Sequence, residues 1–281
     1  MPIYDQGYRR YEARAALHSV RFWPITREAL RLLLAKRAFL GLLAVAWVPF
    51  LVRVVQVYVI TRFPEVGRLA PLNAQLFGAF LNFQTGFVIL LSVFGGAGLV
   101  SNDLRTGAVL VYLSRPLTRR DYVLGKLGVL LALNFSATLV PALLLYLLGL
   151  ALAPDIFLTW SLVWVGPAIV LHALLLSLVI GLLALGVSSL SKSARVAGLG
   201  FFGLLLGLDL VRGLLWVVYR SPLATLVSVE GTLHSIGNAL FGISERQLQA
   251  PWGAAAGVLA LLALGCLWVL RVRVRAVEVV S

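Results

Sequence analysis

The sequence predicts an all-α polytopic membrane protein with six transmembrane helices, an N-terminal amphipathic interfacial helix and both termini in the cytoplasm. Three observations predict this fold class: an apolar composition, six long apolar runs, and basic residues gathered on one side of those runs. Of the 281 residues, 60% are hydrophobic and 12% are charged, and the mean hydropathy is +0.97. A soluble domain is about half apolar and about a quarter charged. Polar side chains are therefore too few here for a soluble enzyme or a disordered binding protein.

Each apolar run is long enough for a helix that crosses roughly 30 Å of hydrocarbon, which takes about 20 residues. The six runs are Ala38–Ile60, Phe83–Val100, Leu124–Leu152, Ser161–Leu190, Leu199–Tyr219 and Trp252–Leu270. The third and fourth runs contain Pro141 and Pro167, so we expect a kink or a tilt in each. None of the runs shows the alternation of polar and apolar residues that is typical of β-barrel strands.

Lysine and arginine lie mainly on one side of the six runs. The N-terminal segment, the segment between the second and third runs with Lys126, the loop 191–196 and the C-terminal tail together hold 18 basic and six acidic residues. The opposite loops hold four of each. Because cytoplasmic loops are enriched in Lys and Arg, the basic side is predicted to face the cytoplasm, with the chain in the cell inner (plasma) membrane. Nearly all of the net charge of +13 then reflects topology, and no nucleic-acid partner is expected.

The chain divides into three parts around these runs. Residues 1–37 are predicted to form a cytoplasmic tail and the interfacial helix, residues 38–270 the six-helix transmembrane domain, and residues 271–281 a basic cytoplasmic tail. Pro24 is predicted to open the interfacial helix. The expected apolar face holds Ile25, Ala29, Leu32 and Leu33, and the expected charged face holds Arg27, Glu28 and Arg31. Such a helix lies on the cytoplasmic leaflet; the alternative is that it extends the first span.

Side chains suited to metal binding or catalysis are scarce. The chain has one Cys, one Met and three His, so no metal site is expected and the chain is predicted to hold no cofactor. Gly125-Lys126 is followed by Leu127, and no phosphate-binding Gly-x-x-x-x-Gly-Lys-Ser/Thr loop occurs. The chain is therefore not expected to hydrolyse ATP itself, and no catalytic residue is assigned.

An intramembrane enzyme of rhomboid-protease type is the main alternative, because it also has six spans. Its one candidate nucleophile worth testing is Ser188, within Gly186-Val187-Ser188-Ser189. A serine nucleophile needs a neighbouring base, but His234 lies in an external segment and the sixth run has no histidine. Helix packing explains the fragment better, and His172 is predicted to be a hydrogen-bonded packing residue.

The segment between the second and third runs (101–122) is a charged elbow. Asn102 or Asp103 is predicted to cap a short cytoplasmic helix, and Pro116 ends that helix by forcing the preceding residue out of helical geometry. A second helix is predicted to start at Thr118, with an acidic residue three positions on. A compact elbow of this kind can receive a push from a cytoplasmic partner.

The elbow resembles that of the permease subunits of type-2 ABC exporters, and is similar to the NosY/Gld-type six-span permeases. In that family an acidic residue and a Thr-Gly pair follow the second span, and a Leu-Ser-x-Pro turn, a basic pair and a Gly-Lys lead into the third. The matching residues here are Asp103, Thr106-Gly107, Leu113-Ser114-Arg115-Pro116, Arg119-Arg120 and Gly125-Lys126. Six spans, cytoplasmic termini and a long external segment before the last span extend the resemblance over most of the chain.

The resemblance implies that the chain is the transmembrane permease subunit of an ATP-binding cassette exporter and forms the substrate pathway. The elbow is then the coupling helix seated in a groove of a separate cytoplasmic ABC ATPase subunit, which binds ATP and magnesium. The residues implied in ATPase coupling are Asp103, Arg105, Thr106, Gly107, Leu113, Ser114, Arg115, Pro116 and Arg119. The other expected partners are a second permease copy or a paralogue and the lipid bilayer, with a periplasmic accessory protein as a further candidate. The substrate stays open: a lipid, a hydrophobic peptide, an antibiotic and a sulfur-containing species are all compatible.

The external segment Ser221–Ala250 is too polar for a full span but contains apolar pieces divided by Pro222 and Gly231. We expect short re-entrant helices that dip into the outer leaflet and cap the pathway, as the resemblance implies. A plain solvated loop is the alternative.

Three ionisable residues within the spans are predicted to form an intramembrane charge cluster: Arg53, Asp209 and Arg212. A charge at mid-bilayer costs roughly 2.5–3.5 kcal/mol, so these side chains should turn inward and pair. Asp209 and Arg212 share a helix face. In one interpretation the excess positive charge attracts an anionic headgroup or carboxylate. In the other, the pair is structural and Arg53 reaches outward to the interface. A channel or proton-coupled carrier would need several intramembrane acids, whereas only Asp209 lies mid-span.

Overall fold

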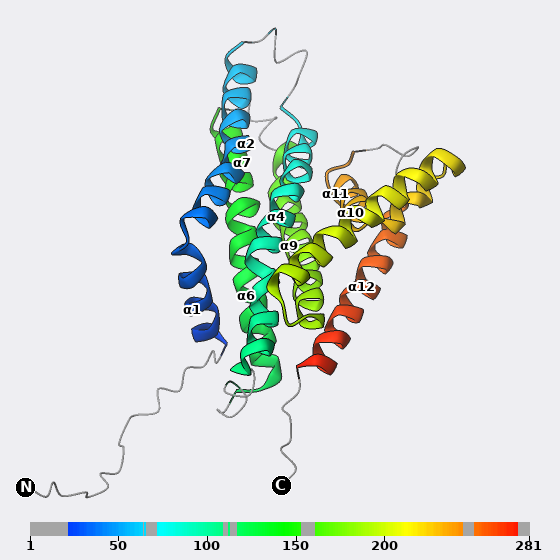
Figure 1. Cartoon of the computed structure of the whole chain (residues 1–281). Helices are drawn as coiled ribbons and strands as arrows, with labels where there is room; N and C mark the ends of the chain where they lie inside the picture. Colours follow the sequence, from blue (N-terminus) through cyan, green and yellow to red (C-terminus); the bar gives the residue numbers. More distant parts are fainter. Residues whose placement is uncertain are drawn as a thin grey trace, which may run out of the picture.

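The computed structural model of the chain describes residues 22–63, 65, 72–108, 112, 117–152, 161–243 and 250–274. Within these ranges every regular element is a helix (Figure 1). The elements are α1 (Trp23–Leu34), α2 (Arg37–Arg62), α4 (Ala74–Thr106), α6 (Arg119–Ala137), α7 (Leu139–Leu152), α9 (Val165–Leu190), α10 (Ala194–Tyr219), η1 (Pro222–Val227), α11 (Val229–Leu240) and α12 (Trp252–Arg273). The predicted all-α fold class is confirmed.

Among the described residues, six stretches of helix are long and apolar enough to cross a membrane: α2, α4, α6 continued by α7, α9, α10 and α12. They match the six predicted runs in order, although α4 begins at Ala74 rather than at Phe83. Asn73 caps this earlier start, because its side-chain oxygen accepts a hydrogen bond from the Leu76 N–H at 3.2 Å. The added turns carry polar side chains that face other helices, such as Asn82, and apolarity alone does not reveal them.

The bundle has two ends (Figure 1). The base end holds the start of α1, the end of α4, the start of α6, the α9–α10 turn and the end of α12. The hairpin end holds η1 and α11 beside the ends of α10 and the start of α12. At the centre, α9 packs against α4, α6, α7, α10, α11 and α12, and most of its side chains are buried. The helices α2, α10 and α12 expose many large apolar side chains, as expected of a bundle surrounded by lipid.

A buried glutamine of α4 stabilises the proline site of one neighbouring span and binds a second span. Pro141 has no N–H, so the carbonyl of Ala137 loses its helical donor, and the helix is interrupted between α6 and α7. The fully buried Gln84 donates from Nε2 to Ala137 O at 2.9 Å and to Ala46 O at 3.0 Å. Ala46 lies in the turn of α2 that precedes Pro49. The distortion predicted at Pro141 is confirmed.

The distortion predicted at Pro167 falls just before α9, since residues 161 and 162 are helical and a turn at residues 163 and 164 precedes Val165. Because α9 begins at Val165, Pro167 lies in its first turn, where the backbone N–H has no helical acceptor to lose. From there α9 continues as a single helix to Leu190.

The first helix, α1, packs lengthwise along α6 (Figure 1). Its buried residues are Ile25, Thr26 and Leu33, and its exposed charged residues are Arg27, Glu28 and Arg31. Leu32 was predicted on the apolar face but is 60% exposed, because Thr26 occupies the contact with α6. Extended backbone at Lys36 separates α1 from α2, so α1 is a helix of its own. Its position on the cytoplasmic leaflet stays a prediction, and the predicted tails at 1–21 and 275–281 lie outside the described residues.

Candidate functional site

The predicted elbow begins later than the sequence indicated. Helix α4 continues through Asn102 and Asp103 to Thr106, so the prediction that one of these residues caps a separate short helix is wrong. No proline or glycine interrupts residues 101–106. The helix ends at Gly107, whose φ of +71° lies in the left-handed region, the conformation that commonly follows a helix C-terminus.

The second predicted helix start of the elbow is confirmed at Thr118. The Thr118 side-chain oxygen accepts a hydrogen bond from the Asp121 N–H at 3.2 Å. In return, Asp121 Oδ2 accepts from the Thr118 N–H at 2.9 Å and from its hydroxyl at 2.8 Å. This reciprocal arrangement is a capping box, and it fixes the direction in which α6 leaves the elbow.

A buried ion pair connects the end of α4 to the start of α6. The Lys126 Nζ lies 2.7 Å from Asp103 Oδ2, and the two side chains are only 6% and 16% exposed. The Tyr122 hydroxyl donates to the same oxygen at 2.8 Å. The rings of Tyr112 and Tyr122 lie 5.7 and 5.5 Å from Nζ, within the range of a cation–π contact. We call Asp103, Tyr122 and Lys126 the elbow node, because they hold two spans together at the base end.

The other predicted coupling residues lie around this node or outside the described part of the chain. Arg105 and Thr106 are exposed on the last turn of α4, and Arg119 is exposed at the start of α6. Leu113, Ser114, Arg115 and Pro116 lie outside the described residues. Lys126 was not predicted as the partner of Asp103. A lysine inside an apolar run requires an acidic partner, and this signal was present.

The glycines at the start of α6 allow α1 to approach closely. A Cβ added to Gly125 would lie 2.9 Å from Ile25 Cβ, and one added to Gly128 would lie 2.9 Å from Thr26 Oγ1. The Thr26 hydroxyl donates to the Gly125 carbonyl at 2.8 Å. The glycine of the Gly-Lys pair thus serves helix packing, while its lysine serves the elbow node.

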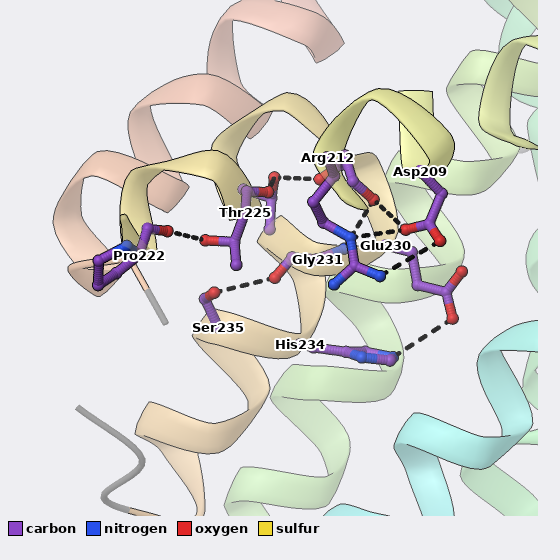
Figure 2. A network of polar contacts seen from close by, with 10 residues as sticks. Asp209, Arg212, Pro222, Thr225, Glu230, Gly231, His234 and Ser235 are labelled. Carbon is purple, nitrogen blue, oxygen red and sulfur yellow. Dashed lines mark hydrogen bonds and ion pairs between the residues drawn. The ribbon is translucent and has the colours of Figure 1, made fainter. Parts of the chain in front are cut away.

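At the hairpin end, an ion pair on α10 attaches to the cap of α11 (Figure 2). Arg212 Nε lies 2.8 Å from Asp209 Oδ1. The Ser228 hydroxyl donates to the same carboxylate oxygen at 3.0 Å. Ser228 also caps α11, since its Oγ accepts from the Gly231 N–H at 3.1 Å. Asp209 therefore binds both the arginine on its own helix and the first turn of α11.

The short helices predicted for the external segment are confirmed as η1 and α11, but Gly231 does not divide them. The division falls at Ser228, which has extended backbone, and Gly231 lies in the first turn of α11. A Cβ added to Gly231 would lie 3.0 Å from Thr225 O and 3.1 Å from Arg212 Cδ. This glycine is required for close approach rather than for a break. Residues 244–249 of the segment lie outside the described residues.

Arg53 does not join this pair within the chain. It lies on α2, where its Nη1 donates to Oε1 of Gln56. Of the predicted charge cluster, one chain therefore brings together Asp209 and Arg212 only.

A cavity of about 690 Å³ lies beside this pair, between α4, α10 and α11. Its polar lining residues include Gln75, Asn82, Arg212, His234, Ser235 and Asn238. Asn82 Nδ2 donates to Asn238 Oδ1 at 3.1 Å across the cavity wall. Polar side chains of α4, α10 and α11 thus gather at the hairpin end of a largely apolar bundle.

Two titratable groups on α11 stand beside the cavity. Burial lowers the pKa of His234 below its usual 6.5, and the Arg212 charge lowers it further. Burial raises the pKa of Glu230, with a further increase from the Asp209 charge. His234 Nε2 lies 3.9 Å from Glu230 Oε1 (Figure 2). Because the His234 pKa is lowered, this contact at neutral pH joins the carboxyl group to a mostly neutral imidazole.

The serine and histidine considered for intramembrane catalysis have packing roles. Ser188 Oγ donates to Ala97 O at 2.7 Å and accepts from the Ser101 N–H at 3.1 Å, so it joins α9 to α4 as predicted. His172 is fully buried, and within the described part of the chain neither ring nitrogen has a hydrogen-bond partner. The prediction that His172 is hydrogen-bonded is therefore wrong. Its ring packs edge-on against Phe241, with centroids 6.1 Å apart.

The fold and these two sites define a polytopic α-helical membrane protein with a buried ion-pair node at one end and a polar cavity at the other. The sequence model described as ABC-2 family transporter protein matches residues 85–247, more than half of the chain. The chain therefore belongs to this family. It is an ABC-2 type permease component rather than an enzyme in itself, and the family implies association with an ABC ATPase partner. A comparison with curated proteins gives no match.

Proposed function

We propose that the chain is the transmembrane subunit of an ABC exporter and receives the stroke of a separate ATPase subunit at the elbow between α4 and α6. The observation that carries this proposal is the elbow node. It joins the ends of two spans through a buried ion pair, so a force applied to the elbow moves α4 and α6 together. The elbow motif also supports an assignment to six-span permeases of the NosY/Gld type.

The length of α4 explains how such a force reaches the other end of the protein. This helix has 33 residues, which at about 1.5 Å per residue span roughly 50 Å. It begins at the hairpin end, where Asn82 is hydrogen-bonded to Asn238 of α11, and it ends at the elbow node. A displacement at the base end is therefore transmitted through α4 to the walls of the cavity of about 690 Å³ at the hairpin end.

The distribution of basic side chains supports an orientation in which the base end faces the cytoplasm. Exposed basic residues of the described chain at the base end are Arg105, Arg119, Arg120, Lys192, Arg195, Arg271 and Arg273. Positive residues favour the cytoplasmic side, so the base end and the elbow face the ATPase, which holds ATP and magnesium. A second permease copy or a paralogue completes the pathway, with a periplasmic accessory protein as a further candidate partner.

The test is to purify the chain with the ABC ATPase encoded beside it and to measure complex formation and ATP hydrolysis. Arg105→Glu and Gly107→Trp should each weaken the complex by at least about tenfold, equivalent to ~1.4 kcal/mol of interface contact. Gly107 has open space around it, but its left-handed φ of +71° disfavours any other residue, so Gly107→Trp counts only where the chain alone stays folded and Arg105→Glu carries the test. Arg220→Glu at the hairpin end, where the arginine is also exposed, and Gly203→Trp, in open space on α10, are the controls and should leave the complex intact. A wild-type chain that retains no ATPase would refute the proposal.

A further inference from the structure

A second cavity lies at the base end, between the start of α6 and the end of α12. It has a volume of about 730 Å³. Its apolar lining residues are Val123, Leu124, Leu267, Leu270 and Val274, and its polar lining residues are Thr118, Arg119, Arg120 and Arg271. We call it the basal groove. Its floor is deeply buried, since Leu270 and Val274 are each 1% exposed.

The rim of the basal groove is strongly cationic. Arg119 and Arg120 come from α6 and Arg271 from α12. Within the described residues, none of the three has an ion pair with a carboxylate. The nearest acid in sequence, Asp121, is not among the lining residues and accepts two hydrogen bonds from the cap residue Thr118. Among the described residues, three positive charges therefore meet an apolar floor without a carboxylate ion pair.

The apolar wall of the groove opens toward the lipid-facing surface of the bundle. Leu124 and Leu267, one from each helix, are 48% and 44% exposed. Both belong to stretches that are apolar enough to cross a membrane. The arginines lie at the termini of those same stretches, where a bilayer places its headgroups. An occupant must therefore be anionic at one end and apolar at the other.

We propose that the basal groove binds an anionic phospholipid. Its phosphate lies among the three guanidinium groups, which bind phosphate through paired N–H donors. Its acyl chains lie over Leu124 and Leu267. Basic pockets between transmembrane helices are a common form of anionic-lipid site.

The bound lipid also stabilises the elbow node. Val274 and Tyr122 form one buried apolar cluster, and Val123 packs against this cluster. Tyr122 in turn donates to Asp103. A lipid that fills the groove holds Val123 and Val274 in place. It thereby favours the arrangement in which Tyr122 and Lys126 both contact Asp103. Removal of the lipid loosens the contact between α4 and α6 without touching the ATPase directly.

The test measures lipid retention by native mass spectrometry on the full chain, purified from nanodiscs that contain phosphatidylglycerol and phosphatidylcholine in equal amounts. The wild type should retain phosphatidylglycerol selectively. Arg120→Gln/Arg271→Gln should weaken this retention by roughly 30-fold, because each arginine facing an anionic lipid contributes about fivefold. Arg119 stays intact because it is also a proposed contact of the ATPase, and lipid retention is read without the ATPase.

Two controls decide between a built site and general charge attraction. Arg27→Gln/Arg31→Gln removes the same charge from exposed positions of α1 and should retain phosphatidylglycerol like the wild type. Leu267→Trp narrows the groove, keeps every arginine, and should lower retention even if the arginine variant folds poorly. Equal losses in both arginine variants, or no preference for phosphatidylglycerol in the wild type, would overturn the proposal. Displacement of the lipid by millimolar inorganic phosphate would also overturn it, because the site would then bind a free anion.

Discussion

Replacing Lys126 with methionine should destabilise the chain far more than its position near a helix end suggests. The substitution removes the ammonium 2.7 Å from Asp103 Oδ2 and leaves a largely buried carboxylate with the Tyr122 hydroxyl as its remaining donor. Removing one partner of a buried ion pair typically costs about 3–5 kcal/mol. Because Asp103 retains 16% exposure and the tyrosine hydrogen bond, we expect the lower end, about 3 kcal/mol.

A double-mutant cycle separates the pair from its surroundings. Asp103→Asn alone should cost a similar amount, because it leaves the ammonium uncompensated. The double variant should lose less than the sum of the single losses by about 2 kcal/mol or more, since no charge is then left alone. Lys192→Met removes an exposed lysine at the same end and should change the free energy of unfolding by less than about 0.5 kcal/mol.

The free energy of unfolding is measured in mixed micelles from the fluorescence of the seven tryptophans. Coincident transitions by circular dichroism check that unfolding is two-state. Single losses that add to within about 0.5 kcal/mol in the double variant would refute the reasoning, because the two side chains would then act independently.

Gln84→Leu should lower the free energy of unfolding by about 1–2 kcal/mol in the same assay, because two carbonyls lose their donor and Pro141 cannot replace it. Asp209→Asn should speed hydrogen exchange of the α11 amides by a few-fold at most, since its ion pair is more than a third exposed and is worth about 1 kcal/mol or less. Folding lowers the pKa of His234 below its usual 6.5. The contribution of the neutral imidazole to the free energy of unfolding is therefore complete above pH 6.5, and it is lost as the pH falls toward the pKa of the folded chain. The protection factors of the α11 amides, which correct exchange rates for their intrinsic pH dependence, should therefore fall below pH 6.5, and His234→Asn should reduce that fall. An unchanged profile in the variant would show that the imidazole, between Arg212, Asp209 and Glu230, does not set it.

The number and order of the spans followed from composition, because a run of about 20 apolar residues has few alternatives to a membrane helix. Local caps were equally accessible: Thr118 with an acid three residues on predicted the start of α6. The distortion at Pro141 was predicted for the same reason, since a missing N–H acts within one turn. These features depend on residues adjacent in sequence.

Errors arose where a distant contact decides the outcome. Leu32 has the right spacing for the apolar face of α1, yet Thr26 is buried instead because it reaches the Gly125 carbonyl. His172 lacks a hydrogen-bond partner among the described residues because its neighbour Phe241 offers only a ring. None of these partners can be read from local spacing.

The two ion pairs of the spans differ in burial, and this difference distinguishes the elbow node from the site at the hairpin end. Asp103 and Lys126 are nearly buried and join α4 to α6, so their pairing resists separation. Asp209 and Arg212 are about equally paired by distance, but each is more than a third exposed, and Asp209 also binds the Ser228 cap. The first pair therefore forms a rigid joint, whereas the second is a contact that can exchange with water or with a ligand in the cavity. A helix of 33 residues connects the rigid joint to the cavity that Arg212 lines. Under the proposed function, a stroke delivered at the elbow therefore acts on the part of the structure that yields most easily, the contact of α11 with α10.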